Sequence, residues 1–216
     1  MHTIKAILFD VDGLMIDSEP LHFQAYKQVL ADFGIEFTME HYLQVWGSDK
    51  DMCLRIVESF KIPLSWQELL DRKNELFRKS FIHQVTPKKG LLELLLQLKG
   101  KYFTAVVSSS QLHEINTVLK TIGVTQFFSK IISAESVEHG KPSPDCYLLA
   151  AEKLGVVPAD CLALEDSPKG VAAAKAAGMA CWAIPGGEMK NQDFSVADKI
   201  LESLTEVYTT LKREFS

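Results

Sequence analysis

The sequence predicts an α/β fold with a mainly parallel sheet and an inserted α-helical domain. Short apolar segments alternate with amphipathic segments of about ten residues along most of the chain, a pattern typical of βαβ units. The alternation stops between residues 18 and 84, where only helical signals occur. The 216 residues also exceed the roughly 150 of a typical domain, so the chain has room for such an insertion.

The strands of the predicted sheet are short and apolar. The first covers residues 4–9, whose nearly continuous apolar composition is typical of a strand buried on both faces of a parallel sheet. Five more strands are expected over residues 102–107, 130–133, 161–164, 180–184 and 199–200. Helices are expected over residues 91–98, 115–122, 144–154, 168–177 and 204–213.

The helical segment begins directly after the first strand. Ser18 is a suitable N-cap, a proline lies in the first turn, and Gly34 ends this helix. Thr38 and Ser48 can cap two more helices, and residues 65–68 form a capping box before a fourth. We therefore expect an α/β core domain of residues 1–17 and 85–216 and a helical domain of residues 18–84.

Composition excludes several classes of protein. The longest apolar runs have about five to seven residues, whereas a membrane span needs roughly 20. The net charge of −5 argues against a large basic surface for nucleic acid. The N-terminus lacks the pattern of a signal peptide, and four scattered cysteines show no CxxC pair, so we expect a cytoplasmic protein with reduced thiols. The cysteines are Cys53, Cys146, Cys161 and Cys181.

Two carboxylates follow the first predicted strand. Asp10 and Asp12 are two residues apart, so in extended backbone they project toward the same face. Gly13 then permits a sharp turn away from the strand. Carboxylates this close repel each other unless a cation lies between them, and hard oxygen ligands suit Mg²⁺.

Further polar residues lie near the ends of other predicted strands, where ligands bind in open parallel sheets. The run Ser108–Ser110 precedes a helix, and its hydroxyls with the helix N-terminus can hold a phosphate group. Lys141 can hold phosphate oxygens, and Asp166, next to Glu165, can supply a third carboxylate. This set predicts metal-assisted phosphoryl transfer, and the absence of G-x-x-x-x-G-K-[ST] excludes a P-loop enzyme.

Each of these motifs, taken alone, also fits a purely structural role. The Asp-x-Asp-Gly sequence can be a polar turn, and three serines after a strand can be a helix cap. Gly-Lys-Pro can be a solvated turn, and Glu-Asp-Ser-Pro an acidic helix start. Four such signals in a consistent order favour a functional site.

The motifs resemble those of the haloacid dehalogenase-like hydrolase superfamily. The first motif, DxDGxxxDSEP, is matched by residues 10–20, and the second by Ser108 after an apolar strand. The lysine of the third is matched by Lys141 in Gly-Lys-Pro, and the fourth by residues 165–167. Within the superfamily the chain looks like the branch of β-phosphoglucomutase and sugar-phosphate phosphatases. The resemblance implies a Rossmann-like three-layer core with a helical cap inserted after the first motif.

The resemblance also implies a role for each matched residue. Asp10 would be the nucleophile that forms an aspartyl-phosphate, and Asp12 the general acid and base, with its backbone carbonyl on Mg²⁺. Ser108 and Lys141 would hold the phosphoryl group. The resemblance places Mg²⁺ on Asp10, Asp12 and Asp166, with Glu165 supporting from outside the ligand set.

Cap residues are expected to select the substrate. His22 matches a histidine near the cap hinge of the mutases, and Lys73-Asn74 matches a cap pair that faces the core there. Lys50 lies in a region that resembles the substrate loop, although an arginine of the mutase loop has no clear counterpart. This departure weakens the mutase interpretation. Ser109 and Ser110 complete the candidate substrate-binding residues.

The sequence leaves a choice between related activities. We expect a Mg²⁺-dependent phosphatase of a small phosphorylated metabolite, a sugar phosphate, that acts as a monomer without nucleic acid or membrane. A phosphomutase that uses the same aspartyl-phosphate is the first alternative. A phospho-acceptor signalling domain also clusters carboxylates and a lysine at strand ends, but it needs no cap of about 65 residues. A catalytically silent binding protein is disfavoured because every motif position is filled.

Overall fold

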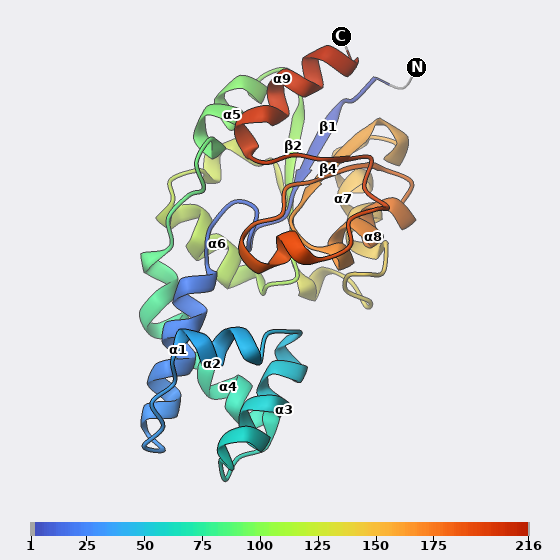
Figure 1. Cartoon of the computed structure of the whole chain (residues 1–216). Coiled ribbons are helices and arrows are strands. Elements are labelled where there is room, and N and C mark those ends of the chain that lie inside the picture. Colours follow the sequence, from blue (N-terminus) through green and yellow to red (C-terminus); the bar gives the residue numbers. More distant parts are fainter. Residues whose placement is uncertain (1–2, 216) are drawn as a thin grey trace. The chain divides into compact units, whose positions relative to one another are not determined.

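The computed structural model describes residues 3–215, which separate into two compact units. The first contains residues 3–17 and 86–215, and the second is Ser18–Val85. We call them the core unit and the helical unit. Figure 1 shows the core unit as a sheet with helices and the helical unit as helices joined by loops.

The core unit is built on a six-stranded sheet with the order β3-β2-β1-β4-β5-β6. Every pairing between these strands is parallel, which confirms the predicted fold class. The strands are β1 (Ala6–Phe9), β2 (Phe103–Val107), β3 (Lys130–Ile132), β4 (Cys161–Glu165), β5 (Ala180–Ala183) and β6 (Lys199–Ile200).

Strand β1 lies in the middle of the sheet, between β2 and β4. All four of its residues have no exposed surface, which explains the continuous apolar run in the sequence. Phe9 pairs with Val106 of β2 and with Leu164 of β4, so the three strands end at almost the same level. The residues that follow them therefore meet at one edge of the sheet.

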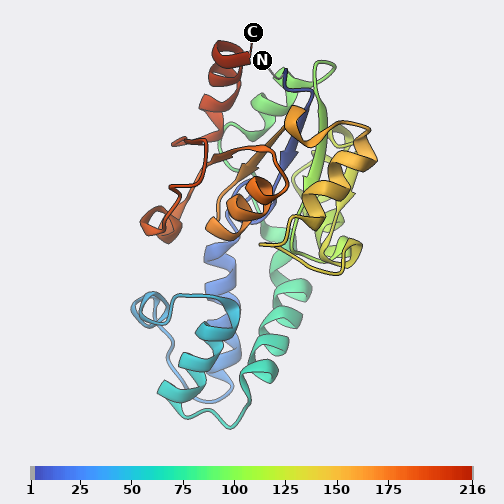
Figure 2. The same cartoon turned by 90° about the vertical axis from the view of Figure 1, so that its right-hand side faces the viewer.

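Helices cover both faces of this sheet (Figures 1 and 2). On one face, small side chains of the strands, such as Ala6 and Ala163, belong to one apolar cluster with Ala173 and Ala174 of α8. Helices α5 and α9 pack against each other on the other face. No helix within residues 3–215 has the length and apolar composition needed to cross a bilayer. The core helices are α5 (Leu91–Leu98), α6 (Leu112–Thr121), α7 (Asp145–Leu154), α8 (Pro168–Ala176) and α9 (Leu204–Phe215).

The helical unit has its own aromatic core, which includes Tyr26, Phe37 and Tyr42. Its helices are α1 (Glu19–Ala31), α2 (Met39–Gln44), α3 (Asp49–Phe60) and α4 (Trp66–Leu76), and a π-helical turn (Phe77–Phe81) follows α4 directly.

The helix starts of this unit follow the capping rules at three of four positions. Thr38 and Ser65 both form complete capping boxes, and the Ser48 hydroxyl accepts a hydrogen bond from a backbone amide of the first turn of α3. Ser18 occupies the N-cap position of α1, but its side chain makes no capping bond. Its backbone is already helical, whereas a capping side chain requires an extended backbone.

Candidate active site

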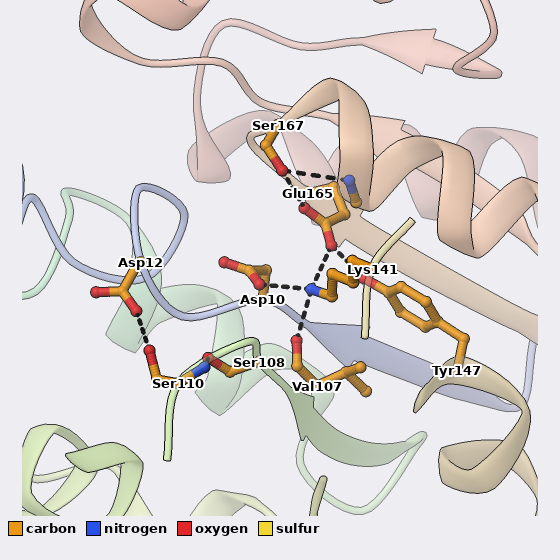
Figure 3. Close-up of polar contacts among 10 residues, drawn as sticks. Asp10, Asp12, Val107, Ser108, Ser110, Lys141, Tyr147, Glu165 and Ser167 are labelled. Atoms are coloured by element: carbon orange, nitrogen blue, oxygen red, sulfur yellow. Dashed lines mark hydrogen bonds and ion pairs between the residues drawn. The ribbon is translucent and has the colours of Figure 1, made fainter. Parts of the chain in front are cut away.

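The candidate site lies at the edge where the central strands end. Asp10 follows β1, Ser108 follows β2, and Glu165 ends β4 with Asp166 next to it. Lys141 comes from the loop before α7 and reaches the same place (Figure 3). The parallel arrangement of the strands is what brings these distant parts of the sequence together.

Lys141 is the centre of the polar network. Its ammonium group donates hydrogen bonds to Oδ1 of Asp10 at 2.6 Å, to Oε1 of Glu165 at 2.6 Å and to the carbonyl of Val107 at 2.8 Å. Its side chain is only 2% exposed. Burial alone would lower the pKa of Lys141, but the two carboxylates outweigh it and hold the pKa above its usual value. The ammonium is therefore charged and fixed, and Figure 3 shows the second oxygen of Asp10 pointing away from it.

Glu165 is held from several sides and has no exposed surface. The hydroxyl of Tyr147, on α7, donates to Oε1 of Glu165 at 2.5 Å, and the hydroxyl of Ser167 donates to Oε2 at 3.4 Å. Tyr147 was not among the residues that the sequence predicted for the site. The one feature of the sequence that could have indicated it is a tyrosine among the apolar residues of a predicted helix. A tyrosine hydroxyl that is buried needs a polar partner, so such a residue points to a buried polar group nearby.

Gly170 leaves the space that the Glu165 carboxylate occupies. A Cβ atom at this position of α8 would overlap the carboxylate carbon and both of its oxygens. We expect Gly170→Ala to displace Glu165 from Lys141, to cost about 1–3 kcal/mol of the free energy of unfolding and to lower activity. Chemical denaturation with activity assays would check this result. Gly140→Ala is the matched control for stability, because a Cβ there meets no atom within 4 Å. Equal losses in the free energy of unfolding in both variants would contradict the argument.

Three carboxylates form an acidic cluster beside Lys141. Asp10, Glu165 and Asp166 each offer one oxygen within 4.8 Å of the others, and all three are buried. Burial raises the pKa of Asp10 to about 7, although Lys141 acts in the opposite direction. Burial, with Asp10 and Glu165 as neighbours, also raises the pKa of Asp166 well above its usual value. Three carboxylates thus face one ammonium, and burial favours the protonated forms of Asp10 and Asp166.

The cluster has the donor atoms and the space for a divalent cation. Carboxylate oxygens are the ligands that Mg²⁺ prefers, and no hydrogen bond to the Asp166 carboxylate comes from the part of the chain whose side chains the structure describes. Gly13 turns with a φ of +79° directly over Asp166, where a Cβ atom would overlap Oδ2. Because Lys141 and Tyr147 already bind Oε1 of Glu165, Asp166 and the second oxygen of Asp10 are better placed to be ligands.

The carboxylate of Asp12 lies apart from the acidic cluster, although the sequence placed Asp10 and Asp12 on one face. Oδ2 of Asp12 accepts a hydrogen bond from the Ser110 hydroxyl at 2.8 Å. Ser108, which is buried, accepts a bond from the backbone amide of Ser110 at 3.0 Å. The turn after β1 and the serine run after β2 are thus joined through Asp12 (Figure 3).

A cavity of about 210 Å³ borders the site. It is lined by Ser108, Ser109, Gly140 and Lys141, together with residues of the loop after β3 and Lys169 of α8. Lys169 was not among the candidate residues from the sequence. Hydroxyl and ammonium groups in the lining suit an anionic group such as phosphate.

The candidate substrate residues of the helical unit lie within that unit as follows. His22 stacks on Phe77 at 4.2 Å between ring centroids, and its buried Nδ1 has no hydrogen-bond partner within the described residues. Burial lowers the pKa of His22 to about 3, and Lys73 adds to this effect. Lys73 is itself only 3% exposed and lies over a tyrosine ring. Lys50 lies 5.6 Å from the centre of a tryptophan ring, and Asn74 is half-buried on α4.

Comparisons with known proteins agree with this geometry. A family model described as haloacid dehalogenase-like hydrolase matches residues 7–184. Hexitol phosphatase B of Escherichia coli (strain K12) is 36% identical over 214 residues, which cover 94% of each chain. The β-phosphoglucomutase of Bacillus subtilis (strain 168) is 32% identical over 216 residues, which cover 94% of this chain and 95% of the mutase.

A solved structure extends the similarity to three dimensions. The crystal structure of CbbY from Rhodobacter sphaeroides in complex with phosphate has a TM-score of 0.78 and 30% identity, with 94% of this chain and 96% of that chain covered. The family match spans both sides of the helical unit and every motif at the strand ends. The chain therefore belongs to the haloacid dehalogenase-like hydrolases.

Proposed function

We propose that this chain is a Mg²⁺-dependent phosphatase that hydrolyses a small phosphorylated metabolite, a sugar phosphate, through an aspartyl-phosphate on Asp10. The observation that carries the proposal is the arrangement of Asp10, Lys141 and Asp166 at one edge of the sheet. Lys141 fixes one oxygen of Asp10 and leaves the other directed away from it. A nucleophile, a cation and a carboxylate for a metal thus stand together in a buried site.

The reaction has two steps. The second oxygen of Asp10 attacks the phosphorus, the bond from phosphorus to the ester oxygen breaks, and Asp12 gives its proton to the departing oxygen. Asp12 then takes a proton from water as that water attacks the aspartyl-phosphate, which releases phosphate and restores the Asp10 carboxylate. Lys141 and Ser108 hold the phosphoryl oxygens in both steps.

The metal site would be formed by Asp10 and Asp166, with the backbone carbonyl of Asp12. Bound there, Mg²⁺ would neutralise the negative charge of the phosphoryl group and allow it to approach the Asp10 carboxylate. Glu165 would hold Lys141 in place rather than bind the metal, because its Oε1 already accepts two hydrogen bonds.

Hydrolysis is favoured over phosphoryl transfer between sugar positions by two observations. The end of the first motif, Asp17-Ser18-Glu19-Pro20, looks like that of the phosphatases. The identity to hexitol phosphatase B is 36%, against 32% to the β-phosphoglucomutase. A phosphomutase is the second candidate function, since both reactions would start from the same aspartyl-phosphate.

We also propose that the helical unit acts as a cap that selects the non-phosphorylated part of the substrate. His22 supports this role, because its buried Nδ1 has no partner among the described residues. Lys50, Lys73 and Asn74 are the other candidates in this unit, and Ser109 and Ser110 in the core unit. The protein is proposed to act as a cytoplasmic monomer.

A panel of phosphorylated metabolites tests the function. We expect release of inorganic phosphate from sugar phosphates in the presence of Mg²⁺. Treatment with EDTA is expected to lower the rate of phosphate release by at least about 100-fold. Restoration by added Mg²⁺ but not by Ca²⁺ is expected, because Ca²⁺ prefers a larger and more flexible ligand set. The reaction products are then separated by chromatography. Isomerised hexose phosphate without net phosphate release would establish the mutase instead, and no turnover with any ester would contradict both.

A further inference from the structure

Lys88 contacts the candidate site but has no role in the function proposed above. It precedes α5, at the point where the chain re-enters the core unit. Its ammonium group donates a hydrogen bond to the carbonyl oxygen of Gly13, in the turn that follows β1. Lys88 thus reaches the turn that contains Asp12 and Gly13.

The segment around Lys88 is attached to this turn by its backbone as well. The amide of Lys88 donates to the carbonyl of Met15 at 2.8 Å, and Pro87 forms an antiparallel bridge with Ile16. These bonds fix the position of the Lys88 backbone, so its ammonium group is held within reach of the Gly13 carbonyl.

A second glycine leaves room for the ammonium group. A Cβ atom at Gly186, in the loop after β5, would lie 2.5 Å from Nζ of Lys88 and 4.0 Å from the carbonyl oxygen of Gly13. The Lys88 ammonium therefore lies between the turn after β1 and the loop after β5, and it is half-buried.

Gly13 connects Lys88 to the acidic cluster. The Cα of Gly13 lies against the Asp166 carboxylate, since a Cβ atom on Gly13 would overlap Oδ2 of Asp166. The carbonyl of Gly13 accepts the hydrogen bond from Lys88. Gly13 thus contacts the positively charged Lys88 through its carbonyl and the Asp166 carboxylate through its Cα side.

We propose that Lys88 is a positioning residue that holds the Gly13 turn over Asp166 and weakens the binding of a divalent cation there by charge repulsion. The inference rests on the proposed metal site. A cation at Asp10 and Asp166 would lie near the Lys88 ammonium, on the other side of Gly13. The two positive charges would repel each other. By linkage, removal of the Lys88 charge must tighten metal binding.

Direct measurement of Mg²⁺ binding by titration calorimetry tests this proposal. We expect Lys88→Gln to lower the Mg²⁺ dissociation constant about three- to ten-fold, because an opposing charge near a divalent ion is removed. Lys88→Arg keeps the charge and is expected to stay close to the wild-type value. Lys89→Gln is the matched control, because it removes the same charge from the neighbouring, exposed position.

A stability measurement separates the electrostatic role from a merely structural one. We expect the Mg²⁺-induced rise in melting temperature to be larger in Lys88→Gln than in the wild type, whereas a lost contact alone would lower the melting temperature equally with Mg²⁺ and with EDTA. Unchanged or weaker Mg²⁺ binding in Lys88→Gln, or an equal gain in Lys89→Gln, would overturn the proposal. If the wild type binds no Mg²⁺, or if Asp166→Asn binds as tightly, the proposed metal site fails instead.

Discussion

Asp10→Asn is expected to lower the rate of phosphate release by at least about 10⁴-fold while the protein stays folded. The amide of asparagine keeps the size of the side chain but cannot attack phosphorus as a carboxylate does, so no aspartyl-phosphate forms. One oxygen remains to accept the bond from Lys141, which in the wild type is 2.6 Å long. Steady-state kinetics with a sugar phosphate and Mg²⁺, together with circular dichroism and thermal melting, would check both parts of the prediction.

The control for Asp10→Asn is Asp71→Asn, which removes a carboxylate from the exposed face of α4. It is expected to leave the rate and the melting temperature within experimental error of the wild type. Trapping of radioactive phosphate on the wild-type chain, and its absence from Asp10→Asn, would identify the covalent step. Substantial Mg²⁺-dependent phosphatase activity in Asp10→Asn would refute the assignment of the nucleophile.

The sequence was informative about the fold because each signal depends on local physics. A strand buried on both faces must be apolar throughout, and Ala6–Phe9 of β1 follow this rule. The short edge strand β6 was also predicted, and it is present. Ser18 shows the limit of local rules, since a good capping residue occupies the N-cap position without making the bond.

The candidate site was predictable to the extent that its residues immediately follow strands. Parallel strands end at a common edge, so position in the sequence translates directly into position in space for Asp10, Ser108 and Asp166. The direction of the Asp12 side chain was less predictable, because the sequence placed it on the same face as Asp10. Side-chain direction at a turn such as that after Asp10 depends on partners from other segments, here Ser110.

Residues that support the site from a distance could not be predicted at all. Tyr147 lies on a helix and Lys88 precedes one, and neither belongs to a motif with known chemistry. Their contacts to Glu165 and Gly13 depend on how segments 18 and 75 residues apart pack together. The requirement for glycine at position 170 likewise exists only because a buried carboxylate lies against α8.

Lys141→Met is expected to be the most destabilising substitution in the site, with a loss of about 3–5 kcal/mol in the free energy of unfolding. Methionine fills a similar volume but leaves the carboxylates of Asp10 and Glu165 buried without a cation, and both had hydrogen bonds of 2.6 Å to the ammonium. The rate of phosphate release should fall about 10³-fold or more, because charge that develops on the phosphoryl group loses its fixed partner. Lys175→Met, which breaks a more exposed ion pair with Asp198, is the control and should cost less than about 1 kcal/mol.

The pH dependence of Lys141→Met gives a second, independent check. The pKa of Asp10 is raised to about 7 in the folded wild type, against roughly 3.9 in an unfolded chain. A carboxyl group with a raised folded pKa destabilises the protein as pH rises from the unfolded value through the folded one, and without Lys141 this penalty must grow. Urea denaturation should therefore find the variant more stable at pH 5 than at pH 8.

The double variant Lys141→Met, Glu165→Gln should regain part of the stability at pH 8 and none of the activity, because one unpaired charge is removed while the phosphoryl group still lacks its cation. Stability of Lys141→Met that does not change between pH 5 and pH 8 would show that the buried carboxylates do not depend on the ammonium.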